Sequence, residues 1–202
     1  MQRARTVGLL LAAGAGTRFD PVHAGRKLDV RIDGVSVAER SFIALSDAVD
    51  AVVVATRDDQ RPIALIARDC GAHVVVPTDA ALGMGHSLAA AAVAAQKLFP
   101  ALEQVVVMLA DMPWVRTGTI RRLLDEAANG NCIVQPRCKG QRGHPVVFPA
   151  RYVSALAACS GDIGARDVMR DNMASVRWVD VDDAGVLHDV DAPGDLSGPS
   201  PE

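Results

Sequence analysis

The chain has 202 residues, half of them hydrophobic, and its formal charge at pH 7 is −3. This length allows one α/β domain or at most two small ones, and no apolar run reaches the ~20 residues that cross a membrane. The slight negative charge gives no support for a nucleic-acid-binding surface, which normally needs a basic face. Aromatic residues make up 3% of the chain, too few for the stacking platforms that bind single strands. Small molecules are therefore the expected partners.

Short apolar runs alternate with helix-period segments rich in alanine from the N-terminus onward. This alternation predicts βαβ crossovers and an α/β fold, with a mainly parallel sheet in a three-layer α/β/α arrangement. The expected strands are Val7–Ala12, Ala51–Ala55, His73–Val76, Gln104–Leu109 and Cys132–Gln135. The expected helices between them are Val37–Ser46, Pro62–Cys70, Ser87–Leu98 and Thr117–Ala128.

The C-terminal part continues the pattern with shorter segments. We expect strands at Pro145–Phe148, Ser175–Asp180 and Leu187–Asp191, and helices at Ala150–Ala157 and Ile163–Asn172. No internal repeat and no linker divides the chain, so we expect a single domain over residues 1–196. Residues 197–202 are serine, glycine, proline and glutamate, a composition typical of a disordered tail.

The N-terminus allows two interpretations. Met1–Arg5, followed by an apolar run and small residues, is similar to a secretory signal peptide. However, cleavage there would delete the first strand of the alternating pattern. The four cysteines are scattered and contain no Cys-x-x-Cys pair, which argues against a disulfide or zinc framework. We therefore expect a cytoplasmic protein with reduced thiols.

A glycine-rich loop with two cations follows the first expected strand. Gly14 and Gly16 let backbone N–H groups approach an anion, and Arg18 and Lys27 can neutralise its charge. Phe19 stands where a Rossmann fingerprint needs its third glycine, and the Gly-Lys-Ser/Thr of a P-loop is absent. The loop favours a triphosphate site of another kind. The alternative is an ordinary βα turn with solvated cations.

Carboxylates follow two other expected strands. In an open parallel sheet, ligands bind beyond the carboxyl ends of the strands. Asp111 follows Gln104–Leu109, and Asp189 lies near the end of the last expected strand. Such hard oxygen ligands suit Mg2+, which takes one or two carboxylates plus substrate phosphates. The alternative for Asp111 is a helix-entry aspartate before a proline-rich turn. An anion loop facing two carboxylates is the layout of a metal–nucleotide site.

A second glycine motif precedes the alanine-rich helix. Gly83 allows a ligand ring to lie against the backbone, and Ser87 offers a hydroxyl. The alternative is a flexible loop with Ser87 near the helix N-cap. His86 between them is either a surface residue or a group with a chemical role, and the sequence supplies no orienting partner for it.

Two further loops have both a capping and a binding interpretation. His144, in the segment Gly143-His144-Pro145, is either a buried or capping residue or part of a site. Asp162 and Arg166 open a helix, where Asp162 can act as N-cap. A helix N-terminus beside an arginine can equally hold a phosphate.

In their order along the chain, these motifs resemble those of the MobA-like nucleotidyltransferases, and within them the molybdenum cofactor cytidylyltransferase group. The resemblance runs from Val7 to about Leu196. It implies a Rossmann-like, mostly parallel sheet of the nucleotide-diphospho-sugar transferase type. It depends on Leu11–Arg18 with Lys27, Gly83–Leu88, Asp111–Pro113, Gly143–Val146, Gly161–Arg166 and Asp189–Leu196.

The activity that this resemblance implies is Mg2+-dependent transfer of CMP from CTP to the terminal phosphate of molybdopterin or the molybdenum cofactor, with release of pyrophosphate. Mn2+ can replace Mg2+ in such a site. A client molybdoenzyme or its chaperone is a further expected partner. Two alternatives stay open: the same chemistry on a sugar phosphate or methylerythritol phosphate, and a non-catalytic nucleotide-binding chaperone.

The resemblance also implies residue roles. The catalytic residues would be Arg18, Lys27 and Asp111, and the metal ligands Asp111 and Asp189. The nucleotide would contact Ala12, Ala13, Gly14, Gly16, Arg18, Lys27, Gly83, Ser87 and Asp111. The acceptor would contact Gly143, His144, Pro145, Asp162 and Arg166. Ala13, where guanylyl-transferring relatives have glycine, favours CTP. The loop before Lys27 is longer than the common spacing, so either Lys27 or Arg26 would meet the phosphates.

Overall fold

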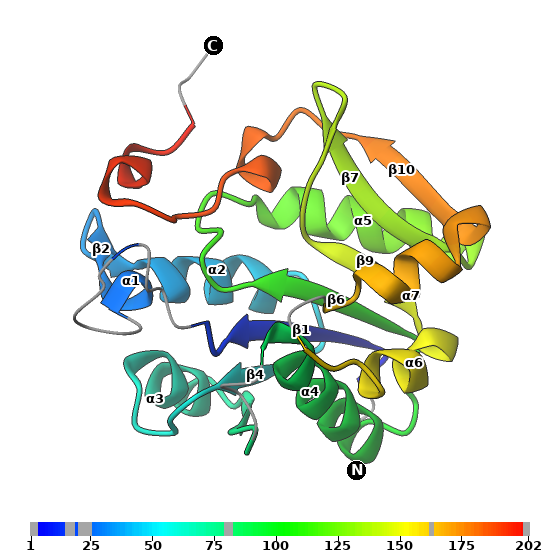
Figure 1. The fold of residues 1–202 in the computed structure, drawn as a ribbon, viewed down its shortest axis with the longest axis horizontal. Helices are drawn as coiled ribbons and strands as arrows, with labels where there is room; N and C mark the ends of the chain where they lie inside the picture. The colour runs from blue at the N-terminus through cyan, green and yellow to red at the C-terminus, as the bar shows by residue number, and fades with distance from the viewer. Residues whose placement is uncertain (1–3, 15–18, 20–25, 79–82, 162–163, 200–202) are drawn as a thin grey trace.

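The computed structural model describes residues 4–14, 19, 26–78, 83–161 and 164–199 (Figure 1). Within this part, an eight-stranded sheet has the order β10-β7-β9-β6-β1-β4-β5, with β8 paired to β7. Pairings among β1, β4, β5 and β6 and between β7 and β10 are parallel, whereas β9 and β8 run antiparallel to their neighbours. The strands of this sheet are β1 (Thr6–Ala12), β4 (Ala51–Thr56), β5 (His73–Val75), β6 (Gln104–Leu109), β7 (Ile133–Cys138), β8 (Gln141–Arg142), β9 (Val146–Pro149) and β10 (Val176–Asp180).

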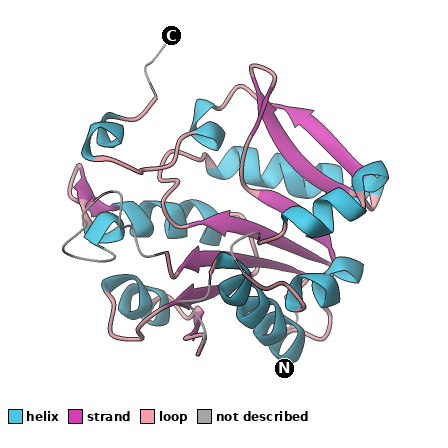
Figure 2. Cartoon of the chain, in the orientation of Figure 1, coloured by secondary structure: helices cyan, strands magenta, loops and turns pink. Residues whose placement is uncertain are grey.

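Helices and short turns connect these strands (Figure 2). The α-helices are α1 (Arg26–Asp29), α2 (Val37–Ser46), α3 (Pro62–Asp69), α4 (Met84–Leu98), α5 (Thr117–Gly130), α6 (Val153–Ala157) and α7 (Arg166–Asp171). The 3-10 helices are η2 (Ala150–Tyr152), η3 (Met173–Ser175), η4 (Ala184–Leu187) and η5 (Pro193–Ser197). A separate hairpin pairs β2 (Arg31–Ile32) with β3 (Val35–Ser36). None of the described helices has the length and apolar character needed to cross a membrane.

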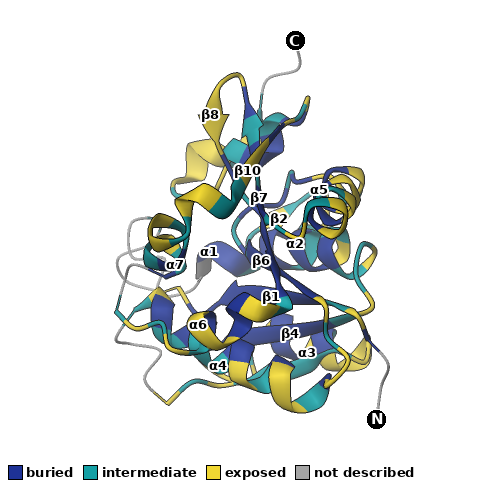
Figure 3. Cartoon of the chain, turned by 90° about the vertical axis from the view of Figure 1, so that its right-hand side faces the viewer, coloured by how far each residue is buried: buried dark blue, intermediate teal, exposed yellow. Residues whose placement is uncertain are grey.

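Helices cover both faces of the sheet, which confirms the expected three-layer architecture. One buried cluster joins α2, α3 and α5 to the sheet, and a second joins α4, α6 and α7. Alternate residues of β1 serve the two clusters, because successive side chains of a strand point to opposite faces. Leu10 packs in the first cluster, and Leu9 and Leu11 pack in the second. Figure 3 shows the sheet buried between helices whose outer sides are exposed.

The expected elements largely match the observed ones. β6 and α2 have the expected bounds, and a capping box at Ser36 with Glu39 explains why α2 begins at Val37. The expected helix from Ser87 begins three residues earlier, at Met84. The segment expected as one helix over 150–157 is η2 followed by α6.

The expected strand Leu187–Asp191 is wrong. Leu187 ends η4, and residues 188–191 form no regular element. Val190 is fully buried and its N–H donates to the Asp111 carbonyl at 2.8 Å. The apolar residue is therefore buried by packing on the loop after β6 and not by a strand ladder. This crossing brings the end of the chain to the carboxyl ends of the central strands.

Candidate functional site

A lysine and three aspartates from separate parts of the chain meet beyond the end of β6. Lys27 Nζ donates to Asp111 Oδ2 at 2.8 Å and to Asp191 Oδ1 at 2.9 Å. Asp189 joins them: one oxygen from each of Asp111, Asp189 and Asp191, which we call the carboxylate cluster, lies within 4.8 Å of the others. Lys27 is only 8% exposed. A buried cation therefore holds two of three closely spaced carboxylates.

The charges in this cluster perturb one another. Burial lowers the pKa of Lys27, but the charges and hydrogen bonds of Asp111 and Asp191 outweigh burial and leave that pKa above its usual value. Burial raises the pKa of Asp189, and repulsion from Asp191 and Asp111 adds to the rise. The site thus contains a firmly charged ammonium and an excess of carboxylates, which favours entry of a further cation.

Hydrogen bonds with β1, α2 and the segment at Val190 hold the backbone around Asp111 in place. The N–H of Ala110 donates to the Leu11 carbonyl at 3.0 Å, which ties the loop after β6 to β1. The buried hydroxyl of Ser41 on α2 donates to the Ala110 carbonyl, also at 3.0 Å. Together with the bond from Val190 to the Asp111 carbonyl, these contacts fix the backbone on both sides of the carboxylate.

Asp191 is a cluster member that the sequence interpretation did not single out. Asp195 in η5 holds its segment, since one carboxylate oxygen accepts hydrogen bonds from the N–H groups of Asp191 at 2.9 Å and Ala192 at 2.6 Å. The two-residue spacing between Asp189 and Asp191 was an available signal, because alternate residues of an extended segment share a side. Asp195 thus positions the backbone that carries Asp191.

The donor set fits a divalent cation. Asp111 Oδ1 is buried and has no hydrogen-bond partner within the described residues. A buried carboxylate oxygen without a partner is costly unless a ligand satisfies it. Carboxylate oxygens are also the ligands that hard cations such as Mg2+ and Mn2+ prefer. Asp111, Asp189 and Asp191 could therefore hold such an ion, as expected for the first two.

The loop after β1 begins in a tightly held backbone. Ala12 and Ala13 are buried, and the Ala13 carbonyl accepts a hydrogen bond from Arg57 Nε. Arg57 directly follows β4, the parallel neighbour of β1, and was not expected in the site. Gly14 is exposed. The expected phosphate ligands Gly16 and Arg18 lie outside the described residues, as does the side chain of Arg26, so only Lys27 of the expected cations is placed.

Packing at the start of α4 explains the glycine in the middle of the Gly83–Ser87 motif. α4 begins against the backbone of the segment before α7: the N–H of Gly85 donates to the Gly161 carbonyl at 2.7 Å, and a Cβ at Gly85 would lie 2.5 Å from the Ser160 carbonyl oxygen. His86 Nδ1 accepts from the Gly161 N–H at 3.3 Å, which gives it a structural partner. Ser87 is 2% exposed.

The Gly143-His144-Pro145 segment lies close to the chain's last turns. His144 N–H donates to the Val186 carbonyl at 2.9 Å, and a Cβ at Gly143 would lie 2.2 Å from that oxygen. His144 Nδ1 is buried and unpaired among the described residues. Burial and the charge of Arg166 lower the pKa of His144, against an opposing effect of Asp189. His144 thus lies within electrostatic range of both Arg166 and the carboxylate cluster. Asp162 lies outside the described residues.

Solved structures share this fold over nearly the whole chain. Rv0371c from Mycobacterium tuberculosis H37Rv, solved as a complex with manganese, is 26% identical, with a TM-score of 0.72 and 96% of each chain covered. A nucleotidyl transferase from Methanothermobacter thermautotrophicus (Mth528) gives a TM-score of 0.80 at 20% identity, covering 96% of this chain and 94% of that one. Molybdopterin-guanine dinucleotide biosynthesis protein A from Archaeoglobus fulgidus gives 0.64 at 17% identity, with 95% of each chain covered.

The comparison with curated proteins gives no significant match. The family comparison is decisive, because the model of the MobA-like NTP transferase domain matches residues 8–177. That range begins in β1, includes Lys27 and Asp111, and ends in β10. The chain therefore belongs to the family of the MobA-like NTP transferase domain and is a nucleotidyltransferase.

Proposed function

We propose that the protein transfers CMP from CTP to the terminal phosphate of molybdopterin or the molybdenum cofactor. An acceptor phosphate oxygen attacks the α-phosphorus of CTP, the bond between the α- and β-phosphates breaks, and pyrophosphate leaves. The acceptor phosphate is already ionised near neutral pH, so no general base is required. The observation that carries the proposal is the carboxylate cluster with its buried lysine at the carboxyl ends of the central strands.

Asp111, Asp189 and Asp191 would hold a divalent ion, Mg2+ or Mn2+. When bound, such an ion neutralises phosphate charge and helps to align the reacting groups. The unpaired Asp111 Oδ1 supports this role, and so does the manganese complex of the relative Rv0371c. The hydrogen bonds of the Ala110 backbone with β1 and α2, and the bond from Val190 to the Asp111 carbonyl, favour a preorganised site.

Lys27 would supply positive charge to the triphosphate. Its raised pKa keeps the ammonium charged, and charge on the departing pyrophosphate grows in the transition state. Gly16 and Arg18 would share this task. Lysine acts as a point charge, whereas arginine can bind two phosphate oxygens at once. We therefore assign stabilisation of the departing pyrophosphate to Arg18 and Lys27 together and not to Lys27 alone.

Base selection would depend on the buried Ala13. Its carbonyl is held by Arg57, so the backbone at this position is not expected to move aside for a larger base. The methyl group would crowd a purine and accept a pyrimidine. One methyl-sized change in a pocket is worth about 1–3 kcal/mol, so Ala13→Gly should narrow the preference for CTP over GTP without reversing it. Ala12, Gly14, Gly83 and Ser87 complete the proposed nucleotide side.

The acceptor would lie on the side of Gly143, His144, Pro145, Asp162 and Arg166. Electrostatic coupling of His144 to both Arg166 and Asp189 supports this, since it relates the acceptor segments to the carboxylate cluster. A cytoplasmic location and delivery of the product to a client molybdoenzyme or its chaperone belong to the same proposal.

The test measures pyrophosphate release and dinucleotide products with CTP and GTP in one reaction. Molybdopterin, methylerythritol phosphate and a sugar phosphate serve as acceptors, each with Mg2+. Asp111→Asn should lower turnover by at least about 100-fold, the size expected for a main electrostatic element. Asp125→Asn, at an exposed carboxylate of α5, is the matched control. Preference for GTP would refute the cytidylyl assignment, and transfer to another acceptor would refute molybdopterin.

A further inference from the structure

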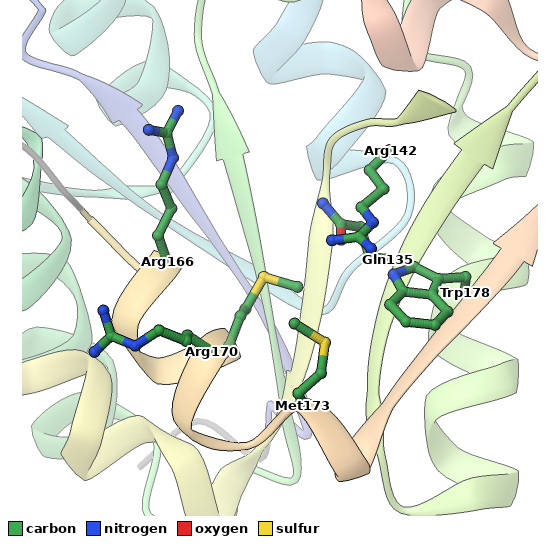
Figure 4. A pocket seen from close by; sticks show the side chains of 7 residues that line it. Gln135, Arg142, Arg166, Arg170, Met173 and Trp178 are labelled. Atoms are coloured by element: carbon green, nitrogen blue, oxygen red, sulfur yellow. The ribbon is translucent and has the colours of Figure 1, made fainter. Parts of the chain in front are cut away.

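A pocket lies at the β10 end of the sheet, on the face covered by α4, α6 and α7 (Figure 4). Its volume is about 230 Å3. Strands β7, β8 and β10 form one side, and α7 with η3 forms the other. We call it the arginine pocket. Besides Gln135, its lining consists of Arg142, Arg166, Arg170, Met169, Met173 and Trp178.

The pocket carries positive charge that the described residues do not neutralise. Arg170 is paired, with Asp167 at 2.5 Å and Asp171 at 3.0 Å. In the part of the chain that the structure describes, neither Arg142 nor Arg166 forms an ion pair with a carboxylate. Two unpaired guanidinium groups at one concavity favour an anion, because each offers planar, forked donors to oxyanions.

The same pocket offers flat and polarisable surface. Trp178 and Met173 are 37% and 41% exposed, so both hydrophobic side chains present surface to the pocket. The Arg142 guanidinium lies 4.8 Å from the centre of the Trp178 ring, so the two form a cation–π pair. Figure 4 shows Gln135, Arg142 and Trp178 side by side, facing Met173. Planar guanidinium and indole groups with thioethers suit a conjugated ring better than a sugar.

Two connections lead from the pocket to the proposed acceptor segment. Gln135 Nε2 donates to the Gly143 carbonyl at 3.1 Å. The second is electrostatic: the charge of Arg166 lowers the pKa of His144, and the charge of Asp189 opposes this effect. The volume is below the ~300–1,000 Å3 of sites that enclose a whole drug-sized ligand. The pocket therefore suits one part of a ligand whose remainder extends toward the carboxylate cluster.

We propose that the arginine pocket binds a flat part of the acceptor that bears its own negative charge, remote from the reacting phosphate. This inference depends on the proposed function and sharpens it. The acceptor must present two features at once: a phosphate for the transfer and a conjugated, anionic region for Arg142, Arg166 and Trp178. A sugar phosphate has only the first of these features.

The direct test uses fluorescent 6-carboxypterin, which is flat and anionic but has no phosphate and cannot react. Its anisotropy is titrated with the full-length protein, and neutral 6-methylpterin and non-planar glycerol 3-phosphate are tested as competitors. Arg142→Gln should weaken binding at least about tenfold, the loss expected for one charge-assisted contact. Trp178→Leu should weaken it by a similar factor, because it removes the stacking surface of the indole ring. Arg177→Gln is the control, since this arginine neighbours Trp178 on β10 but pairs with Glu126 of α5.

Unchanged binding in Arg142→Gln and Trp178→Leu, with melting temperatures equal to wild type, would overturn the pocket whatever the transfer assay gives. If neutral 6-methylpterin competed as well as unlabelled 6-carboxypterin does, the proposal that the pocket selects a negatively charged ligand would be overturned. In the transfer reaction, the same two variants should raise the acceptor KM and leave the CTP KM unchanged, and a matching rise in both would also overturn the inference. Absence of transfer with every acceptor, by contrast, refutes the proposed function.

Discussion

Replacement of Lys27 by methionine tests whether the lysine balances the carboxylate cluster. The change keeps side-chain length but removes the ammonium that contacts Asp111 and Asp191, whose side chains are 21% and 42% exposed against 10% for Lys27. Removing one partner of a buried ion pair costs about 3–5 kcal/mol. Because water screens the more exposed carboxylate, we expect a loss near the lower end, about 3 kcal/mol. For a chain of this size, that loss lowers the melting temperature by roughly 6–12 °C.

Thermal denaturation followed by circular dichroism, first in EDTA and then with Mg2+ or Mn2+, measures this effect. A divalent cation should restore much of the lost stability, because it replaces the missing charge. At a metal concentration 100-fold above Kd, binding stabilises the folded state by about 2.7 kcal/mol. The metal-induced rise in melting temperature should be larger in Lys27→Met than in wild type, where the cation competes with Lys27 for Asp111.

The matched control is Lys97→Met, at an exposed lysine in the last turn of α4. Such surface changes usually stay within about 0.5 kcal/mol. The reasoning fails if Lys27→Met melts at the wild-type temperature in EDTA and gains no more from Mn2+ than wild type does. In that case Lys27 does not stabilise the carboxylate cluster, and a divalent cation has no lost stability to restore.

Three further predictions concern the surroundings of the site. Asp183→Asn should lower unfolding free energy in urea by about 1–3 kcal/mol, because the buried carboxylate accepts from Thr119 Oγ1 at 2.6 Å. Gly85→Ala should cost about 1–3 kcal/mol in the same assay, since its Cβ would meet the Ser160 carbonyl oxygen. The lowered pKa of His144 predicts stability that falls as pH drops below about 6.5, and His144→Gln should flatten this fall in melting temperature.

Much of the fold was predictable because its signals are local. The run Gln104–Leu109 is buried along nearly its whole length and forms a central strand between two helical layers, which is what a continuous apolar run indicates. The bounds of α2 follow from the Ser36 and Glu39 capping box. β7 continues beyond the expected end, through Pro136, whose carbonyl still accepts from the Gly143 N–H at 2.9 Å.

The site was predictable only in part, because its contacts join residues far apart in the sequence. Lys27 is 84 positions from Asp111 and 164 from Asp191. Residue type and position after β6 indicated Asp111 as a possible metal ligand, and Asp189 was indicated through an expected strand that does not form. Neither signal showed that Lys27 would contact a carboxylate. Arg57 belongs to no motif that the sequence analysis could recognise. It reaches the Ala13 carbonyl because β4, which it follows, pairs in parallel with β1, and sequence periodicity does not specify that pairing.

The position of Lys27 explains how three carboxylates can lie so close together. Two unit charges 4 Å apart interact by about 4 kcal/mol at an effective dielectric constant of 20, so the carboxylate cluster alone would oppose folding. The lysine offsets this repulsion from a buried position. Asp189 and Asp191 stay partly exposed, and one oxygen of Asp111 has no hydrogen-bond partner among the residues that the structure places. The fold can therefore be stable without a metal ion and still attract one.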